Sequence, residues 1–250
     1  MTFWQWVKYI LLATFLPNSL VRMEWRMLRL LNKDRKDFGL SKLGMQADLR
    51  EVAKNHSKDM VKKDYFEHVN LKGETPADRL KVQRVTDVVS GENLAKIGGY
   101  PNPVVEAEEG LMKSPGHRAN ILNKKYNCVG IGIIKSKDDI YYFTQNFAKR
   151  VLKFTKKIRK RVSLKRGLRL KGFSFEPLSG IYYKVTFSGT AKALYKGVIN
   201  LRDDHFDFNL NFGETGRFEV SLFAMPKENP EDSELANKFE VKVMNWWFWF

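Results

Sequence analysis

The spacing of apolar residues changes along this chain and divides it into two parts of different fold class. In the first part, apolar side chains recur every three to four residues, which is the period of an amphipathic helix. From residue 172 onward they alternate with polar residues, which is the period of a half-buried strand. The pattern therefore predicts an α+β domain followed by a small all-β, sandwich-like domain.

The expected elements follow from this pattern and from the turn residues between them. The helical stretches are Met23–Lys36, Asp48–Lys63, Pro76–Leu80 with Thr75 as its cap, and Pro103–Met112. Two β-rich runs, Cys128–Ile134 and Ile140–Thr144, predict a hairpin. Later strands are expected at 182–187, 193–201, 205–212, 217–223 and 238–244. His56 falls on the apolar face of the second helix, where a hydrogen-bonded core histidine is the simpler interpretation.

Positive charge is concentrated between the two parts. The chain has a net charge of +16, and residues 149–171 contain 12 Lys and Arg residues with no acidic residue. We expect this segment to be a basic linker between a domain at 24–148 and one at 172–250, although Leu164, Leu168 and Leu170 alternate as in a strand. The side chains expected to contact an anionic surface are Lys153, Lys156, Lys157, Arg159, Lys160, Arg161, Lys165 and Arg166.

The expected partner of such a segment is an anionic membrane surface or a cell-wall polymer, since basic amphipathic stretches bind anionic surfaces. A solvated linker with no partner is the alternative. Nucleic acid is disfavoured, because the chain has no helix-turn-helix, zinc-finger or RNP-type pattern. Five aromatic residues end the chain at 246–250, and Trp4 and Trp6 lie near its start. We expect both aromatic termini to share a membrane-facing surface with the basic segment, whereas a last strand packed into the sandwich is the alternative for 246–250.

The N-terminal residues 1–23 begin with a hydrophobic and aromatic stretch. Its uninterrupted apolar core, Tyr9–Leu16, is too short for a membrane-spanning helix. It fits the apolar region of a signal peptide or an interfacial anchor, whereas an ordinary helix packed on its own domain is the alternative. We therefore expect an extracellular or cell-surface protein, with the N-terminal segment as a candidate membrane anchor. The single cysteine, Cys128, excludes an intrachain disulfide.

Two histidines and a glutamate stand beside turn residues in the first part of the chain. His68 follows Phe66-Glu67, Glu92 follows Gly91, and His117 follows Pro115-Gly116. Two imidazoles and a carboxylate can hold a divalent metal such as zinc, with His68 and His117 as ligands, or can polarise a water molecule. Spacing alone does not bring the three together, and hydrogen bonds between loops are the alternative use.

An ordered set of short motifs carries a family resemblance. The most specific are Gly91-Glu92-Asn93-Leu94-Ala95 and the string from Ser114 to Leu122, SPGHRANIL. Others lie at residues 31–40, 56–60, 65–68, 73–80, 129–132 and 144–148, in that order. Together they resemble the CAP superfamily (cysteine-rich secretory proteins, antigen 5 and pathogenesis-related 1) in its prokaryotic, SCP-like form, over residues ~27–148.

The resemblance implies an α-β-α sandwich with a cleft formed by His68, Glu92 and His117, lined also by Asn93 and Ser114. A second acidic residue of the eukaryotic cleft is replaced at Ser114. Family members bind metals, sterols or protein partners, and a few are proteases.

Three functions are therefore open. The first is an exported, non-enzymatic protein whose His/Glu cleft binds a metal or a small or lipid ligand and whose β-domain attaches to the surface. The second is a metal-dependent, protease-like hydrolase in which His68, Glu92 and His117 are the catalytic candidates. The third is a polyanion-binding protein. The absence of HExxH and GxSxG motifs favours a binding protein over an enzyme.

Overall fold

The structure is a computed structural model that describes residues 20–245. These residues form two compact units. The first unit contains residues 20–85 and 90–149, and the second contains residues 86–89 and 150–245. The expected N-terminal segment lies outside the described residues for most of its length, and the aromatic cluster at 246–250 lies outside them entirely.

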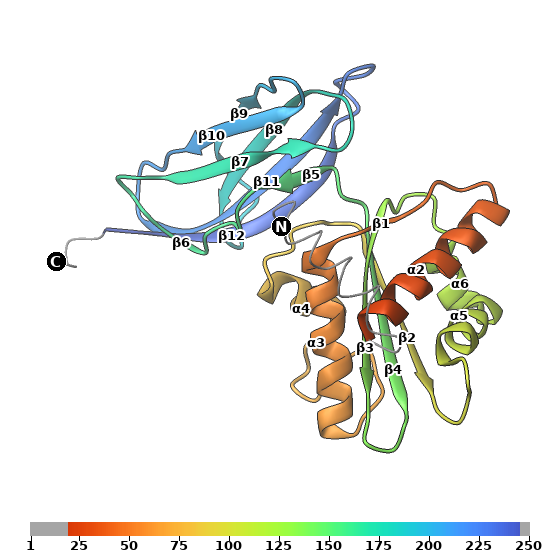
Figure 1. The fold of residues 1–250 in the computed structure, drawn as a ribbon. Coiled ribbons are helices and arrows are strands. Elements are labelled where there is room, and N and C mark those ends of the chain that lie inside the picture. Colours follow the sequence, from red (N-terminus) through yellow and green to blue (C-terminus); the bar gives the residue numbers. More distant parts are fainter. Residues whose placement is uncertain (1–19, 246–250) are drawn as a thin grey trace. The chain divides into compact units, whose positions relative to one another are not determined.

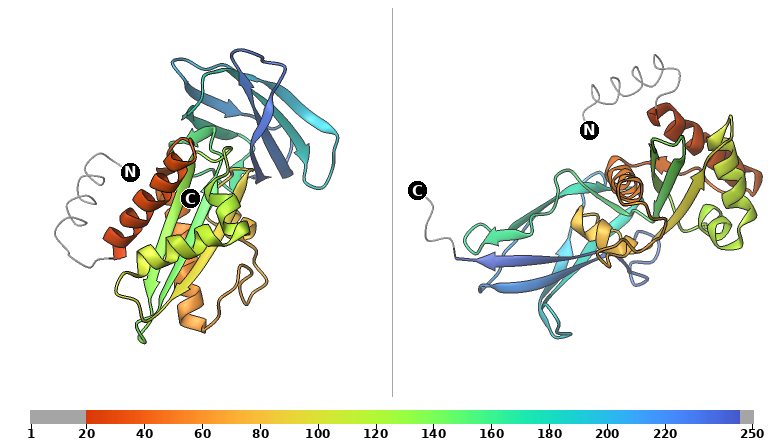
Figure 2. Two further views of the ribbon diagram at one scale, coloured as in Figure 1. Left: turned by 90° about the vertical axis from the view of Figure 1, so that its right-hand side faces the viewer. Right: turned by 90° about the horizontal axis from the view of Figure 1, so that it is seen from below.

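The first unit is a sheet covered by helices on both faces. Its strands are β1 (Gly44–Met45), β2 (Ser90–Ile97), β3 (Cys128–Lys135) and β4 (Tyr141–Ala148), in the order β1-β3-β4-β2. Helix α3 (Ala47–Lys63) packs on β3 and β4. The opposite face carries α2 (Leu20–Asp37), α5 (Pro103–Lys113) and α6 (Pro115–Ile121), as Figures 1 and 2 show. This α-β-α sandwich confirms the predicted fold class of the first domain.

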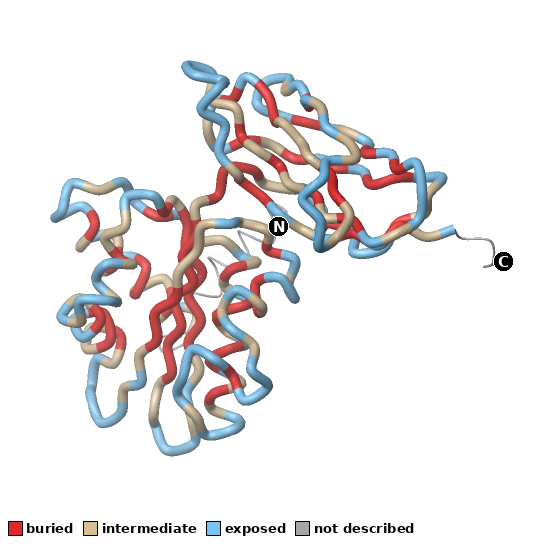
Figure 3. Tube along the Cα trace, turned by 180° about the vertical axis from the view of Figure 1, so that it is seen from behind, coloured by how far each residue is buried: buried red, intermediate tan, exposed pale blue. Residues whose placement is uncertain are grey.

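Two glycines of β3 allow α3 to approach the sheet closely. A Cβ atom at Gly130 would meet the backbone of Leu49 and Arg50, and one at Gly132 would meet that of Ala53 and Lys54, closer than real Cβ atoms come. The central strands β3 and β4 are consequently buried along nearly their whole length (Figure 3). The backbone of α3 therefore packs directly against the backbone of β3, with no side chain between them at these two glycines.

A buried arginine holds two loops of the first unit together. Arg35, at the end of α2, is 1% exposed. Its guanidinium donates to the carbonyl oxygens of Ser41 (2.8 Å), Ile121 (2.7 Å), Asn123 (2.9 Å) and Tyr126 (3.3 Å). A charged group buried in this way is satisfied by hydrogen bonds, so its role is structural.

The expected helices and the hairpin are present with boundaries shifted by a few residues. The short helix at Thr75 is α4 (Pro76–Val82), and its cap is real: the Thr75 and Asp78 side chains each bond the other's backbone N–H. Three elements of the first unit were not predicted, namely β1, β2 and α6. Helix α6 has seven residues and β2 carries the polar Glu92 and Asn93 in its middle, so neither shows a clear period.

The second unit is a β-sandwich, which confirms the expected architecture. One sheet has the order β10-β7-β5 and the other β6-β12-β11-β8-β9. Both sheets contribute to one apolar core. The strands are β5 (Leu152–Phe154), β6 (Arg161–Ser163), β7 (Leu168–Ser174), β8 (Leu178–Phe187), β9 (Ala193–Ile199), β10 (His205–Leu210), β11 (Gly216–Pro226) and β12 (Glu234–Met244).

The segment expected to be a basic linker is instead part of this sandwich. Residues 150–171 belong to the second unit and supply β5, β6 and most of β7. Six of their apolar side chains are core residues: Val151, Leu152, Ile158, Val162, Leu168 and Leu170. Apart from the buried Arg150, the basic residues lie between these apolar positions and are exposed or half-buried, so the high charge density concealed the strands.

Residues 86–89 belong to the second unit although they lie between α4 and β2. Asp87 and Arg150 form a buried ion pair at 2.6 Å, and the Asn237 side-chain amide donates to the Thr86 hydroxyl at 2.9 Å. The sequence pattern did not predict this excursion, because four residues show no period. Within residues 20–245, no helix has the length and apolar character needed to cross a membrane.

Candidate functional site

The carboxylate of Glu92 is the centre of the cleft predicted in the first unit. It projects from β2 and is 2% exposed. The Arg79 guanidinium donates to both of its oxygens, at 2.9 Å to Oε1 and 2.7 Å to Oε2. His68 approaches Oε1 with Nδ1 at 2.9 Å. The Asn146 amide, in the orientation that satisfies both of its atoms, donates to Oε2 at 3.1 Å. Glu92 is therefore fully engaged by side chains of its own unit.

The local fold of residues 68–80 holds Arg79 in place. The Asn70 side-chain oxygen accepts from the backbone N–H groups of Lys72 and Glu74, which shapes the turn before α4. The cap at Thr75 then starts the helix, and Arg79 lies one turn later. Its guanidinium also donates to the carbonyl oxygens of His68 (2.7 Å) and Glu74 (3.0 Å). One arginine thus connects the loop that carries His68 to the strand that carries Glu92.

The two cleft histidines have different surroundings. The His68 side chain is 48% exposed, and its Nδ1 must donate to Glu92 when the carboxylate is ionised and the ring is neutral. Nε2 of that neutral ring then carries a lone pair. His117 is half-buried on α6, and burial, together with the nearby His68, holds its pKa below the usual histidine value. His117 therefore carries a neutral imidazole ring at neutral pH.

A network of side-chain amides connects β2, β4, α5 and α6 behind Glu92 and His117. The Asn93 amide donates to the His117 carbonyl (3.0 Å) and to the Gln145 side-chain oxygen (3.1 Å), and Asn120 donates to the Asn93 side-chain oxygen (2.9 Å). Gln145 in turn donates to Glu108 at 2.8 Å. Burial raises the pKa of Glu108 to about 8, and the negative charge of Asp34 acts in the same direction. A neutral carboxyl thus ends the network at neutral pH.

His56 lies behind Glu92 and is fully buried, as expected for a core histidine. Its Nε2 donates to the carbonyl of Glu67 at 3.0 Å and is 4.0 Å from Glu92 Oε1. Burial lowers its pKa, against the opposing effect of Glu92. A cavity of about 190 Å³ between α3 and α4 is lined by His56 and Arg79 but by neither His68 nor His117.

The structure places the predicted site residues as follows. The His68 and Glu92 side chains are in contact, and Asn93 bonds the backbone carbonyl of His117, whereas Ser114 lies at the junction of α5 and α6 without a side-chain capping bond. Across residues 20–245, no three His, Cys, Asp or Glu side chains are arranged to share a metal ion. Sequence reasoning quoted Arg79 only as part of a motif and missed its role. The cap at Thr75 was the available signal for Arg79, because it fixes the start of α4 and therefore the direction of the side chains in the next helical turn.

The predicted basic residues lie on the second unit. Lys153 is half-buried on β5, and the other seven are exposed. Lys171 and Arg169, which lie in the same stretch, both pair with Asp207, at 3.3 and 2.7 Å. Arg161, Lys165 and Arg166 gather at the end of the sandwich where β6 meets β12.

Comparison with known sequences identifies relatives of the first unit. Residues 28–147 match the model of the CAP, or cysteine-rich secretory protein, family. Protein YkwD of Bacillus subtilis (strain 168) is 35% identical over 124 residues, which cover 50% of this chain and 47% of that protein. Membrane protein YlbC of the same organism is 39% identical over 127 residues, which cover 51% of this chain and 34% of that protein. The chain thus spans less than half the length of these relatives.

Two solved structures resemble the same region. An extracellular SCP-domain protein from Bacillus anthracis str. Ames is 33% identical, with a TM-score of 0.45, over 51% of this chain and 40% of that one. An outer surface protein from Borrelia burgdorferi is 25% identical, with a TM-score of 0.48, over 53% of this chain and 96% of that one. By the family match, the motif set and the α-β-α sandwich, residues 28–147 are a CAP domain of the cysteine-rich secretory protein family.

Proposed function

We propose that this chain is an extracellular or cell-surface CAP-domain protein whose cleft binds a small or lipid ligand through the rings of His68 and His117, without chemistry. The observation that carries the proposal is the engagement of Glu92. Both of its oxygens accept hydrogen bonds from Arg79, and Oε1 also faces His68 Nδ1. Glu92 then serves to orient the His68 ring, whose side chain is 48% exposed, and Nε2, the nitrogen turned away from the Glu92 contact, is the atom that meets a ligand.

A hydrolytic mechanism finds less support in this arrangement. A general base must lie within hydrogen-bond reach of the proton that it removes and must have a free lone pair to accept it. The Glu92 carboxylate is 2% exposed and is held by a guanidinium on both oxygens. Proton transfer to Glu92 would first have to weaken the charge-assisted contact in which Arg79 Nη2 lies within 2.9 Å of both carboxylate oxygens.

The donor set also fits a resident zinc ion poorly. Catalytic zinc sites use three protein ligands and leave one position open. His68 and His117 supply two ring nitrogens, and Glu92 is turned toward Arg79. We therefore assign no step to a metal. A neutral imidazole nitrogen instead suits a ligand that carries hydroxyl or amide donors.

The proposed location rests on two observations. Residues 1–16 contain the short apolar and aromatic stretch typical of signal peptides and interfacial anchors. One relative, 39% identical over the CAP region, is a membrane protein of Bacillus subtilis.

A titration of the full chain, labelled with ¹⁵N in its histidine rings, tests the proposed function. The probes are zinc chloride, N-acetylglucosamine as a hydroxyl- and amide-bearing molecule, and cholesterol in detergent micelles as a lipid. We expect an organic probe to shift the ring signals of His68 and His117 in a saturable way, and to lose this effect in a His68→Ala/His117→Ala variant. Tight, stoichiometric zinc binding that the double variant loses would contradict the proposal and favour the metal-dependent hydrolase.

A further inference from the structure

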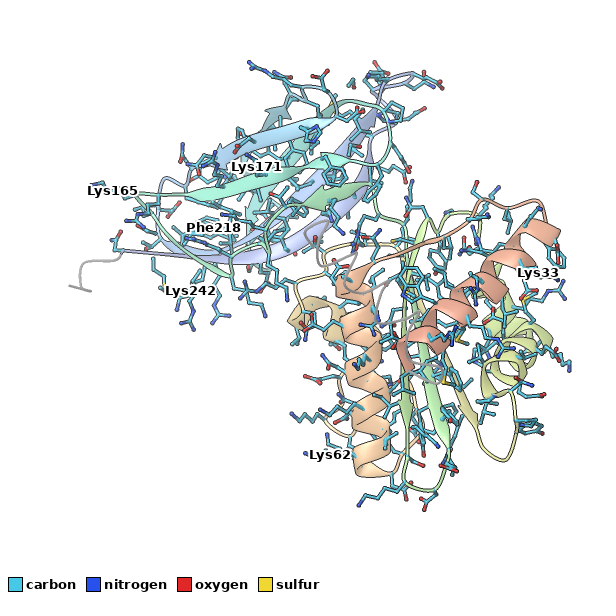
Figure 4. All side chains as sticks on the ribbon, viewed as in Figure 1. Lys33, Lys62, Lys165, Lys171, Phe218 and Lys242 are labelled. Carbon is cyan, nitrogen blue, oxygen red and sulfur yellow. The ribbon has the colours of Figure 1, made fainter. Side chains whose placement is uncertain are left out.

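The larger sheet of the second unit has one face in the core and one face turned away from it. Along β11, Phe218, Val220 and Leu222 are buried in the sandwich, so the residues between them lie on the opposite face. Figure 4 shows Phe218 inside the unit and Lys242 extending away from β12. We call the surface on the side of Lys242 the outer face.

An apolar strip crosses the outer face from β9 to β11. It consists of three direct partners in neighbouring strands, Val198, Tyr182 and Phe223. The ring centroids of Tyr182 and Phe223 are 5.7 Å apart, and the ring planes are tilted by 48°. Val198 is 49% exposed and the two aromatic side chains are half-buried. The strip is therefore open to a partner but does not stand far out from the sheet.

Two lysines oppose each other beside the apolar strip. Lys184 on β8 and Lys196 on β9 are direct partners, and they share the face of Tyr182 and Val198 because two residues separate each lysine from the strip. Neither lysine forms an ion pair with another residue of 20–245. Like charges directly opposite each other in a sheet are destabilising. An anion that bridges the two ammonium groups of this lysine pair would remove the repulsion.

The outer face carries further positive charge away from the strip. A basic row is formed there by exposed direct partners on β6, β12 and β11, namely Arg161, Lys242 and Arg217. Of the acidic residues between this row and the lysine pair, Glu219 is already paired with Lys238 at 2.8 Å, and Glu240 is exposed. Four strand residues, or about 13 Å, separate the row from the level of the lysine pair. An anion that reaches both groups must be a chain with repeated negative charges.

We propose that the outer face binds an acidic polysaccharide. The apolar strip receives the C–H faces of the sugar rings, since aromatic side chains offer rigid apolar surface, and the lysine pair binds a carboxylate of the same chain. The half-buried rings of Tyr182 and Phe223 do not protrude enough to enter a bilayer, and a polyanion without sugar rings would leave the strip unused. The surface lies in the second unit, so it does not depend on the cleft of the CAP domain.

Calorimetric titration of the full chain at low salt tests this surface. The probes are oligogalacturonate, in which every sugar ring carries a carboxylate, and a neutral maltooligosaccharide of the same length. We expect oligogalacturonate to bind more tightly and to be released by salt. Lys184→Gln/Lys196→Gln should weaken its binding about tenfold or more, as the loss of a charge-assisted contact does. Tyr182→Thr/Phe223→Thr removes both rings, keeps side chains that suit a strand, and should also weaken the binding about tenfold.

Two matched variants serve as controls, and circular dichroism checks that each variant folds. Lys156→Gln/Lys227→Gln removes the same charge from exposed positions between strands of the second unit. Phe173→Thr/Phe175→Thr removes another aromatic pair, with ring centroids 5.4 Å apart, from β7 and the residue after its end. Both controls should bind oligogalacturonate like the wild type.

Three results overturn the proposal. The first is the absence of oligogalacturonate binding at low salt, and the second is an equal loss of binding in the control variants and in the variants of the outer face. The third is equally tight binding of polyphosphate, single-stranded DNA or anionic vesicles that Tyr182→Thr/Phe223→Thr leaves unchanged. This last result would assign the outer face to negative charge alone rather than to an acidic sugar chain.

Discussion

Arg79 and Glu92 form an ion pair that joins helix α4 to strand β2, in which a single guanidinium nitrogen, Nη2, contacts both carboxylate oxygens. The two N–H···O distances are 2.9 and 2.7 Å, and both side chains are at least 90% buried. Because the same guanidinium also binds the carbonyl oxygens of His68 and Glu74, the pair fixes the loop that carries a cleft histidine. The position of the His68 ring therefore depends on a residue that lies outside the three predicted cleft side chains.

Replacing Arg79 tests the energetic side of this relationship. Arg79→Met leaves the Glu92 charge buried without its partner, which should reduce the stability of the first unit by about 3–5 kcal/mol. Amide hydrogen exchange of β2 and β4 measures it. Adding Glu92→Gln removes the orphaned charge and should recover part of the loss. Lys33→Met breaks an exposed pair with Asp37 and should cost no more than about 1 kcal/mol. If Arg79→Met and Lys33→Met reduced the stability equally, the Arg79–Glu92 pair would have no special structural role.

The charge of His68 should control the titration of His117. Burial lowers the pKa of His117, and the positive charge of protonated His68 lowers it further. His68→Gln removes that charge and should raise the pKa of His117, whereas His68→Lys makes the charge permanent and should lower it. Histidine ring NMR signals followed against pH give the two shifts. Shifts of the same sign in both variants would show that the two rings do not interact electrostatically.

Glu108 should make the first unit less stable as the solution becomes more basic. Its pKa is raised from 4.5 to about 8 by burial, so the folded chain holds a proton that the unfolded chain has released. The contribution is fully present below pH 4.5 and is lost as pH rises to about 8. Glu108→Gln keeps an acceptor for Gln145 and should flatten this dependence. Unfolding monitored by hydrogen exchange between pH 5 and 8 gives the slope. A slope that the variant leaves unchanged would rule out Glu108 as its source.

The close packing of α3 on β3 gives a prediction about the fold. Gly130→Ala places a methyl group against the backbone of Leu49 and Arg50, and should destabilise the first unit by about 3 kcal/mol or more. Gly110, on helix α5, has open space around its Cβ position, so Gly110→Ala should instead stabilise by about 0.5–1 kcal/mol. Thermal unfolding followed by circular dichroism compares the two. A neutral Gly130→Ala would mean that α3 can move away without cost.

The sequence predicted elements whose period is strong and missed those whose burial is irregular. Helix α3 was found because Leu49, Val52, Ala53, His56 and Met60 share one buried face. Strand β2 was missed because Glu92 and Asn93 are buried at its centre, so polarity did not mark its outer face. Family motifs, rather than spacing, were needed to suggest that His68, Glu92 and His117 meet.

For the basic segment the sequence analysis missed strands whose period is regular, because the high positive charge was given more weight than the alternation of apolar residues. Leu168 and Leu170 alternate with Arg169 and Lys171 in a regular strand, yet the absence of acidic residues suggested a basic linker. Pairing decides such cases: Arg161 gains Lys242 as its neighbour only when β6 joins β12 from a distant part of the chain. No local pattern in either segment contains that information.

The central claim is that Glu92 orients His68 so that Nε2 of the ring faces a ligand. The protonation state of each ring nitrogen tests it most directly, through long-range ¹H–¹⁵N correlation spectra of the full chain at a pH where His68 is neutral. We predict a proton on His68 Nδ1, donated to Glu92, and a bare Nε2. A neutral His68 ring with its proton on Nε2 would contradict the claim, because Nδ1 would then have no proton to donate to the carboxylate.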